Sequence, residues 1–308
     1  MKINISVVIP TRNRQCELKA AVKSVFEQSR PPEEIIVVDD GSCPPVSEDI
    51  FEGCPQGTQT RLFRRERSLG ANNSRNLAIR QASGDWIAFL DDDDRFKQGK
   101  IEAVADAIAN NPDADLFYHP AEIRMVKENV VYRTKPEKFD KNKDIFRALL
   151  IKNLVGGSSM VTARREALIE AGLFDVYMPA LQDYELWLRL AKSGCRFCFI
   201  DSPLTTYCCH TDNSSISKPI DTTQKALEII EKKYGNDYAG LAPGEIAAYN
   251  EWKKHRMVHK AILNGQVLIA FKEQMKIFAA HPHPRHLLGG VAILLGRKLT
   301  FLLRAKLN

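Results

Sequence analysis

The sequence lacks any apolar run long enough to cross a lipid bilayer, since a membrane-spanning helix needs roughly 20 such residues. It also lacks a signal peptide, because the chain begins Met1-Lys-Ile-Asn and leads directly into an apolar stretch. Internal repeats and low-complexity segments are absent as well. We therefore expect a protein that stays in the cytoplasm, and not a secreted, membrane-spanning or repeat protein.

A disulfide framework is not expected either. The seven cysteines are an odd number, and nothing directs the chain to an oxidising compartment, so free thiols are predicted. Cys195-x-x-Cys198 and the Cys208-Cys209 pair have spacings that a zinc site can use. The first pair lies in a predicted strand, however, where alternation does not bring two thiols onto one metal. We expect these cysteines to pack in the core.

Acidic residues are absent after Glu273, although six basic residues follow it: Lys276, Arg285, Arg297, Lys298, Arg304 and Lys306. The whole chain has 44 basic and 38 acidic residues, a formal net charge of +6, so this tail accounts for the excess. A nucleic-acid-binding protein usually spreads positive charge over a folded face with aromatic residues interleaved. A basic, apolar tail is instead typical of contact with an anionic membrane surface, and we expect no nucleic-acid partner.

The chain does have the length and composition of an ordinary globular protein. Its 308 residues are 44% hydrophobic and 27% charged, enough for one α/β domain of roughly 200 to 250 residues and a smaller appendage. Apolar runs without alternation at residues 3–9, 35–38 and 86–90 predict strands buried on both faces. Pro10 is expected to end the first of them. A helical pattern separates the first two, which makes a βαβ unit with a parallel sheet.

Polar turns follow all three strands, at residues 11–14, 39–42 and 91–94. Ligands of such sheets bind beyond the carboxyl ends of the strands, so we expect the three turns to meet at one edge. The third turn is four consecutive aspartates, whose charges repel one another. A divalent cation that carries phosphate oxygens is the best reason to keep such a cluster at a strand end, although a solvated acidic turn is the alternative.

Four further segments complete the pattern. Residues 70–82 predict a helix with Arg75 in its first turn, where a cation is badly placed for the helix dipole and so faces an anion or a base. Asp183 lies near the start of another predicted helix, as a functional carboxylate or as an N-cap. Residues 207–215 are expected to form a polar loop whose His210 is a metal ligand or a loop histidine. From Asp221 onward the chain is predicted to be helical, and residues 287–303 form one amphipathic helix.

Six motifs are similar, in content and in order, to those of the family 2 glycosyltransferases, inverting enzymes of the GT-A fold. The resemblance covers about residues 3–217 and rests on Val8-Ile9-Pro10-Thr11-Arg12-Asn13, Ile36-Val-Val-Asp39-Asp40-Gly41-Ser42, Gly70-Ala-Asn-Asn-Ser-Arg75-Asn76, Phe89-Leu90-Asp91-Asp92-Asp93-Asp94, Gly172-Leu173-Phe174-Asp175 and Asp183-Tyr-Glu-Leu-Trp187-Leu-Arg-Leu. It implies a Rossmann-like, mixed α/β domain at residues 1–217, with 218–308 as a helical C-terminal region.

The resemblance also implies roles for individual residues. Those expected to bind the nucleotide are Pro10, Thr11, Arg12, Asp40, Arg75, Asp91 and Asp92, with Asp40 on the uracil edge. Asp93, the second Asp of an Asp-x-Asp motif, and His210 are expected to hold Mn²⁺ or Mg²⁺. Asp183 matches the catalytic base of the family. Many members carry Glu where this chain has Gln182, which leaves the acceptor contacts open, and Ser74 stands where Ala is common.

The expected activity is metal-assisted transfer of a sugar, with inversion, from a nucleotide-sugar donor. The first candidate for this donor is a UDP-sugar. The expected acceptor is a hydroxyl of a glycan or lipid-linked saccharide of the bacterial cell envelope, such as a lipopolysaccharide precursor. A nucleotidyltransferase is a less favoured alternative, because the loop after the first strand has no glycine. A catalytically inactive nucleotide-sugar-binding protein is another. The tail is expected to lie on the inner face of the membrane, or else to be buried or to form a homodimer contact.

Overall fold

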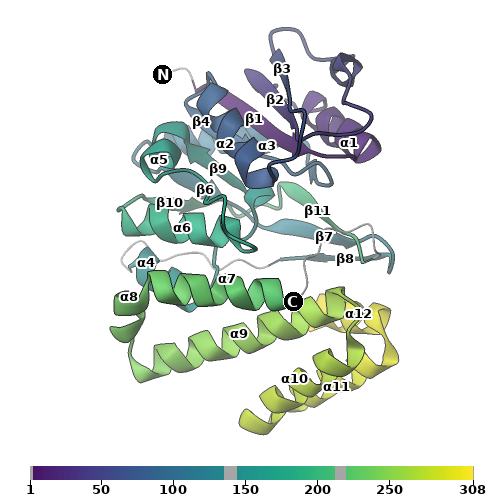
Figure 1. The fold of residues 1–308 in the computed structure, drawn as a ribbon, viewed down its shortest axis with the longest axis vertical. Coiled ribbons are helices and arrows are strands. Elements are labelled where there is room, and N and C mark those ends of the chain that lie inside the picture. Colours follow the sequence, from purple (N-terminus) through teal and green to yellow (C-terminus); the bar gives the residue numbers. More distant parts are fainter. Residues whose placement is uncertain (1–2, 135–143, 212–219, 308) are drawn as a thin grey trace.

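The structure is a computed structural model and describes residues 3–134, 144–211 and 220–307 (Figure 1). Its centre is a seven-stranded sheet in the order β10-β6-β9-β4-β1-β2-β3. The strands are β1 (Ile5–Thr11), β2 (Glu34–Asp39), β3 (Gln59–Arg64), β4 (Trp86–Phe89), β6 (Leu116–Tyr118), β9 (Val161–Arg164) and β10 (Phe197–Phe199). Only β9 runs antiparallel to its neighbours, β4 and β6. The predicted parallel βαβ unit is therefore present, within a mixed sheet.

The first strand extends two residues beyond its predicted end. Pro10 lies inside β1, opposite Val38 of β2. The carbonyl of Val8 accepts from Leu90 on the β4 side, so the backbone of Pro10, two residues on, faces that same side, where β4 has ended. No ladder hydrogen bond is lost there, and a strand tolerates proline at such a position.

Helices cover both faces of the central sheet. On one face α1 (Gln15–Phe26) and α3 (Lys100–Asn110) pack against Val7, Ile9 and their neighbours. On the other lie α2 (Ala71–Gln81), α4 (Ile145–Ile151), α5 (Arg165–Glu170) and α6 (Gln182–Lys192), packed against Val8 and Ile36. Alternate residues of β1 thus enter two different cores, which explains why its sequence is apolar without a break.

A second sheet of four strands, in the order β5-β11-β7-β8, lies beside the acidic turn. It consists of β5 (Arg95–Phe96), β7 (Ala121–Met125), β8 (Val130–Arg133) and β11 (Thr205–Cys209). The prediction of a polar loop from Tyr207 was wrong at its start, because β11 runs to Cys209 and pairs with β7. His210 follows directly, and residues 212–215 of the expected loop lie outside the described part.

The C-terminal region is helical from residue 220: α7 (Ile220–Lys233), α8 (Gly235–Ala239), α9 (Pro243–Leu263), α10 (Val267–Ala280), α11 (Pro284–Leu295) and α12 (Arg297–Leu307). The prediction of one helix over residues 287–303 was wrong. Gly296 has φ of 115°, a conformation that ends α11 and that glycine adopts readily. Helix α12 then turns back, and Figure 1 shows it beside β8.

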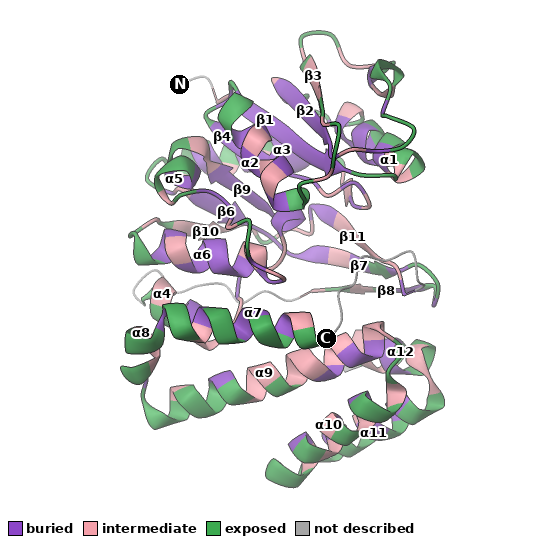
Figure 2. Ribbon diagram, viewed as in Figure 1, coloured by how far each residue is buried: buried purple, intermediate pink, exposed green. Residues whose placement is uncertain are grey.

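The C-terminal helices are attached to the rest by a third apolar cluster. Phe301 and Ile293 are buried in it together with Val258 of α9 and with Met125 and Val130 of the small sheet. The outer surface of α10 and α11 is largely exposed, as Figure 2 shows. Among the described residues, no helix has both the length and the apolar character needed to span a membrane.

Candidate active site

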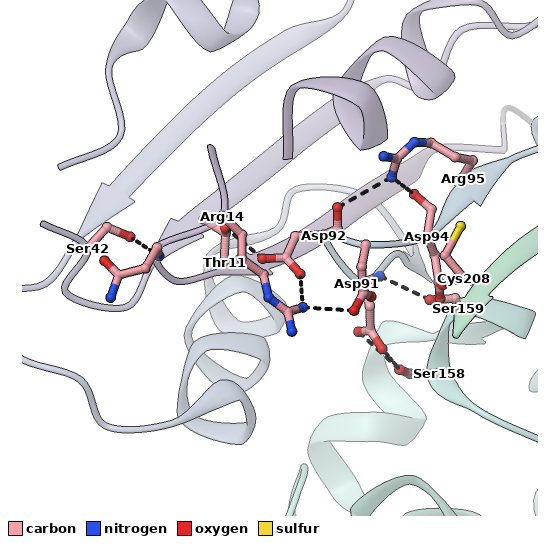
Figure 3. A network of polar contacts seen from close by, with 12 residues as sticks. Thr11, Arg14, Ser42, Asp91, Asp92, Asp94, Arg95, Ser158, Ser159 and Cys208 are labelled. Carbon is pink, nitrogen blue, oxygen red and sulfur yellow. Dashed lines mark hydrogen bonds and ion pairs between the residues drawn. The ribbon is translucent and has the colours of Figure 1, made fainter. Parts of the chain in front are cut away.

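The three polar turns meet at the carboxyl edge of the central sheet, as the sequence predicts. The Thr11 hydroxyl donates to Asp92 Oδ2 at 2.8 Å, across 81 positions of sequence. The Asn13 amide donates to Ser42 Oγ, also at 2.8 Å. Figure 3 shows these contacts in one network with the acidic turn. The edge therefore brings together residues from the loops after β1, β2 and β4.

The four aspartates occupy different environments. Asp91 is half-buried, and its backbone amide donates to Ser159 Oγ at 3.0 Å. Asp92 is buried, and Asp93 is partly exposed. Asp94 is fully buried; Cys208 N donates to its Oδ1 at 2.9 Å, and its Oδ2 has no partner within the described chain. Only Asp91 and Asp93 therefore present their carboxylates to the open side of the turn.

Arg14 is a residue of this site to which the sequence analysis assigned no role. Its Nη1 donates to Asp92 Oδ1 at 3.0 Å and to Asp93 Oδ2 at 2.8 Å. The residue lies in the first polar turn, but its pairing with a turn 78 positions away depends on the sheet. A signal was available, since a second arginine beside Arg12 in a turn that faces four aspartates is a candidate counterion.

The negative charges of the turn are incompletely neutralised by Arg14. Burial, and then the charge of Asp93, raises the pKa of Asp92 to about 6 against the effect of Arg14. Burial and the charge of Asp91 likewise raise the pKa of Asp93. Burial raises the pKa of Asp94 well above its ordinary value, as do Asp93 and Asp91. Such a cluster favours an added cation.

The surroundings of Asp93 are compatible with a metal that takes most of its ligands from a substrate. Asp93 and His210 line one cavity of about 370 Å³, together with Glu17, Glu122 and Cys208 among others. Within residues 3–134, 144–211 and 220–307, no three His, Cys, Asp or Glu side chains stand close enough to hold an ion by themselves. Mg²⁺ and similar ions often bind through one or two carboxylates plus substrate phosphates and water, which fits this arrangement.

Arg75 connects the acidic turn to the predicted base. Its Nη2 donates to Asp91 Oδ1 at 2.5 Å, and its guanidinium lies over the Phe174 ring, 5.5 Å from the centroid. Phe174 is held in place by Asn76, whose side chain donates to the Phe174 carbonyl and accepts from its amide. The charge of Arg75 also acts on Asp183. Arg75 therefore faces an anion, as predicted, and this anion is the carboxylate of Asp91.

Asp40 has every acceptor position in use. Oδ1 accepts from Arg65 and Leu69 at 3.0 Å each, and Oδ2 from Ser68 at 2.5 Å and Gly70 at 2.8 Å. Burial alone would raise its pKa, but these hydrogen bonds lower it. Asp40 thus fastens residues 65–70 beside the start of α2. A base edge that binds Asp40 would have to replace one of these four donors.

The two other residues predicted at the nucleotide are placed differently. Pro10 is buried within β1, and Arg12 is exposed in the turn after it. The edge therefore brings Thr11, Asp91 and Asp92 together, with Arg75 bonded to Asp91, whereas Arg12 is exposed and Pro10 is buried.

Asp183 is the second residue of α6, and it is half-buried. Its Oδ1 accepts from the Tyr184 amide at 2.7 Å. The residue at the N-cap position is Leu181, so the structure does not use Asp183 as the cap. Gly157 is adjacent, because a Cβ built there would lie 3.6 Å from Asp183 Oδ2. The glycine therefore leaves space directly in front of the carboxylate.

The two possible zinc sites are absent from the described part of the chain, and all seven cysteines are free. None is fully buried, and Cys16 and Cys43 are exposed. The prediction of core cysteines is therefore only partly right: five are half-buried, and three of these, Cys195, Cys198 and Cys209, pack against the cores.

Residues 6–172, more than half of the chain, match the family model described as "Glycosyl transferase family 2". The chain belongs to this family. An uncharacterized glycosyltransferase of Haemophilus influenzae is 33% identical over 231 residues, which are 75% of this chain and 76% of that protein. The predicted family is thereby confirmed, and the protein is a glycosyltransferase.

Two further comparisons concern fold and relatives. A UDP-Glc:alpha-D-GlcNAc-diphosphoundecaprenol beta-1,3-glucosyltransferase of Escherichia coli, WfgD, is 29% identical over 190 residues, 62% of this glycosyltransferase and 70% of WfgD. The mannosyltransferase PcManGT from Pyrobaculum calidifontis, solved with GDP-Man and Mn²⁺, superposes with a TM-score of 0.58 at 16% identity, over 100% of this chain and 87% of that one. This likeness, with the family match, confirms the predicted GT-A fold.

Proposed function

We propose that this glycosyltransferase transfers a sugar from a nucleotide-sugar donor, UDP-linked in the first place, to a hydroxyl of a lipid-linked saccharide, with inversion. The observation that carries the proposal is that Arg75 links two carboxylates: it donates a hydrogen bond to Asp91, and its charge acts on Asp183. One carboxylate lies on the donor side and the other remains free to accept a proton.

Asp183 acts as the general base. A base must be ionised and within reach of the acceptor hydroxyl, and Asp183 is only half-buried, with Gly157 in front of it. Asp183 takes the proton of the acceptor hydroxyl, which makes the hydroxyl oxygen nucleophilic. This oxygen attacks the anomeric carbon from the face opposite the diphosphate. The bond from the anomeric carbon to the donor phosphate oxygen breaks, and the nucleoside diphosphate leaves.

The donor lies along the edge formed by the three polar turns. Thr11, Arg12 and Asp40 are at the nucleoside end, together with Pro10 of β1. Arg75, Asp91 and Asp92 are at the diphosphate end, where Arg75 balances the turn. Asp93 and His210 hold Mn²⁺ or Mg²⁺, which would neutralise charge on the leaving diphosphate as a Lewis acid. PcManGT with GDP-Man and Mn²⁺ supports this assignment by analogy.

The acceptor assignment draws on the E. coli relative, whose name specifies a saccharide on diphosphoundecaprenol. An enzyme that acts on such a lipid works at a membrane surface. Helices α10, α11 and α12 expose nine large apolar side chains: Leu268, Ile269, Leu287, Leu288, Val291, Leu294, Leu295, Leu299 and Leu302. Single exposed leucines are ordinary, but a group of this size on neighbouring helices indicates an interaction surface.

The charge on these helices selects an anionic lipid surface as the partner. Exposed lysines and an arginine accompany the apolar group: Lys272, Lys276, Arg285, Lys298 and Lys306. Arg297 and Arg304 turn inward and do not belong to this exposed group; Arg297 donates to the Thr211 carbonyl and Arg304 donates to His259. We propose that the enzyme binds peripherally to the cytoplasmic face of the membrane through this surface.

The substitution Asp183→Asn tests the transferase mechanism. General-base catalysis contributes roughly 10²- to 10⁴-fold, so we expect kcat to fall by about 10³-fold with UDP-sugar affinity unchanged. Asn retains an oxygen for the Tyr184 amide, so the melting temperature should stay the same. Steady-state kinetics and UDP titration measure the two quantities. Turnover within threefold of the wild type would remove Asp183 from its role.

A further inference from the structure

Arg256 of α9 is a half-buried cation that the family match, which ends at residue 172, does not include. Its Nε is buried without a hydrogen-bond partner in the described chain. The guanidinium lies over Trp252, 5.6 Å from the ring centroid, and forms no ion pair with any described residue. A guanidinium that is partly withdrawn from water and has no ion-pair partner among the described residues is costly for the fold, which indicates a group that it binds.

The charges around Arg256 place it on the acceptor side of the site. Burial lowers its pKa, whereas Asp183, Tyr184 and Tyr207 act to raise it. Asp183 is thus the carboxylate that acts on Arg256, and none of the aspartates of the turn at residues 91–94 is among these groups. Arg75 and Asp91 face Asp183 from the donor side, and Arg256 approaches it from the C-terminal helices.

A second arginine extends the positive charge toward the exposed helices. Arg304 of α12 donates to Nδ1 of His259, which lies one turn along α9 from Arg256. Burial, followed by the charges of Arg304 and Arg256, lowers the pKa of His259 well below its ordinary value, so this histidine is neutral. Burial also lowers the pKa of Arg304, against the effect of Tyr132. Arg256 and Arg304 therefore both lie near His259, and Arg256 is the one of the two whose charge acts on Asp183.

We propose that Arg256, with Arg304 beside it, binds a phosphate of the acceptor, so that the enzyme selects saccharides linked to lipid through a phosphate or diphosphate. The inference rests on the proposed function and deepens it. Arg304 follows the exposed Leu299 and Leu302 on the same helix. A lipid chain lying on the exposed apolar face would therefore bring its phosphates to Arg304 first and to Arg256 next, with the sugar at Asp183.

The test uses two synthetic acceptors that carry the same sugar and the same alkyl chain. In one a diphosphate joins sugar and chain, and in the other the chain is attached directly as a neutral glycoside. For Arg256→Gln we expect KM for the diphosphate acceptor to rise at least 10-fold, with KM for the neutral glycoside and for the donor unchanged. Arg256→Lys should restore part of the loss, because it keeps the charge without the bidentate geometry.

Lys254→Gln is the matched control, since Lys254 lies exposed on the same helix and its loss removes the same charge. It should leave all three KM values unchanged. An equal effect of Arg256→Gln on both acceptors would overturn the proposal in favour of a role at Asp183 alone. A rise in KM for the donor alone would overturn it as well, because the phosphate bound would then be the donor's.

A binding measurement separates this proposal from the proposed function. Farnesyl diphosphate, which carries no sugar, is titrated into the full-length protein in the presence of UDP. We expect its affinity to fall at least 10-fold in Arg256→Gln and UDP affinity to stay unchanged. If Arg256→Gln weakens farnesyl diphosphate binding but the wild type transfers no sugar, the phosphate site is supported and the transferase mechanism is rejected. Unchanged binding would reject the site, whatever the activity.

The melting temperature guards against a folding defect. Removing an unpaired buried cation should leave the melting temperature unchanged or raise it. A fall of more than about 5 °C in Arg256→Gln, which for a chain of this size is more than 1 kcal/mol of stability, would show that Arg256 supports the fold, and would overturn its assignment as an anion-binding residue.

Discussion

At the residue scale, opposing influences act on the carboxylate of Asp183. Burial raises its pKa above the ordinary value, and the charge of Asp91 acts in the same direction. The Tyr184 amide, Arg256 and Arg75 act to lower it. The net effect is a raised pKa, which makes the ionised carboxylate of Asp183 a better proton acceptor than that of an ordinary aspartate.

This balance predicts a pH dependence of kcat. Only ionised Asp183 accepts the acceptor proton, so kcat falls as the pH drops through a pKa above the usual aspartate value of about 3.9. Arg256→Gln removes a charge that lowers this pKa, so the acid limb should move to higher pH. Profiles at saturating donor, acceptor and Mn²⁺ measure the shift. An acid limb that stays in place, or moves to lower pH, would contradict the placement of Arg256 beside Asp183.

At the scale of elements, the acidic turn depends on the strands and helices that hold it. Lys100 of α3 is fully buried, and its Nζ donates to the Ser159 carbonyl at 2.8 Å and to Thr205 Oγ1 at 3.2 Å. Ser159 Oγ in turn accepts from the Asp91 amide. The turn is therefore supported from α3, β11 and the segment before β9, so that Asp91 and Asp93 keep their positions at the open side.

The substitution Asp93→Asn tests the proposed metal position in this turn. With UDP and Mn²⁺ present at about 100 times their dissociation constants, binding should stabilise the wild type by about 2.7 kcal/mol. The variant should lose the part that depends on Mn²⁺, which thermal unfolding with and without EDTA measures. Asp106→Asn is the control, since Asp106 is exposed on α3. Full Mn²⁺-dependent stabilisation of Asp93→Asn would place the metal elsewhere.

Helix α11 carries five of the nine exposed apolar side chains of the proposed membrane surface. Leu288 and Leu295 are 57% and 68% exposed, and burial of each leucine in the interface contributes on the order of 1.5 kcal/mol. Replacing both by Gln should weaken binding to vesicles with anionic phospholipid at least 10-fold without changing the melting temperature. Sedimentation with vesicles measures this.

The control for that experiment is Ile169→Gln on α5, because Ile169 is also exposed, at 40%, and belongs to the opposite part of the molecule in Figure 1. Light scattering of the wild type measures whether a second copy of the chain covers the apolar face instead. The contrary result is that the wild type, the double variant and Ile169→Gln bind vesicles equally while only the double variant fails to dimerise. That result would assign the apolar face to a second copy of the chain.

At the scale of the whole molecule, the C-terminal helices are part of the fold and of the site. Helix α12 packs on β8, and Lys233 of α7 donates to the buried Glu185 of α6 at 2.6 Å. The second attachment reaches the helix that carries Asp183. Truncation near Pro284 would remove Phe301 and Ile293 from a shared core and should destabilise the fold.

Phe301→Ala tests this attachment without truncation. Phe301 is fully buried, and replacing such a side chain by Ala usually costs 3–5 kcal/mol. We expect one cooperative unfolding transition in urea, shifted by that amount. Leu302→Ala, its exposed neighbour, should change the stability by less than about 0.5 kcal/mol. A first transition confined to the helices, with the sheet unaffected, would contradict a shared core.

The sequence by itself determined the central sheet and the edge where ligands bind. Unbroken apolar runs at β1, β2 and β4 mark strands buried on both faces, and parallel strands necessarily bring their following turns to the same edge. The motifs of the family place Asp183, Arg75 and the acidic turn in order along the chain. These features follow from local patterns, so they are readable before any tertiary contact is known.

Only the tertiary structure decided which charges meet. The pairing of Arg14 with Asp92 and Asp93, the occupation of Asp40 by residues 65–70, and the approach of Arg256 to Asp183 all join segments far apart in sequence. The small sheet and the division of α11 from α12 also depend on long-range packing. Hydrophobic periodicity reports which face of an element is buried, and carries no information about the partner against which that face is buried.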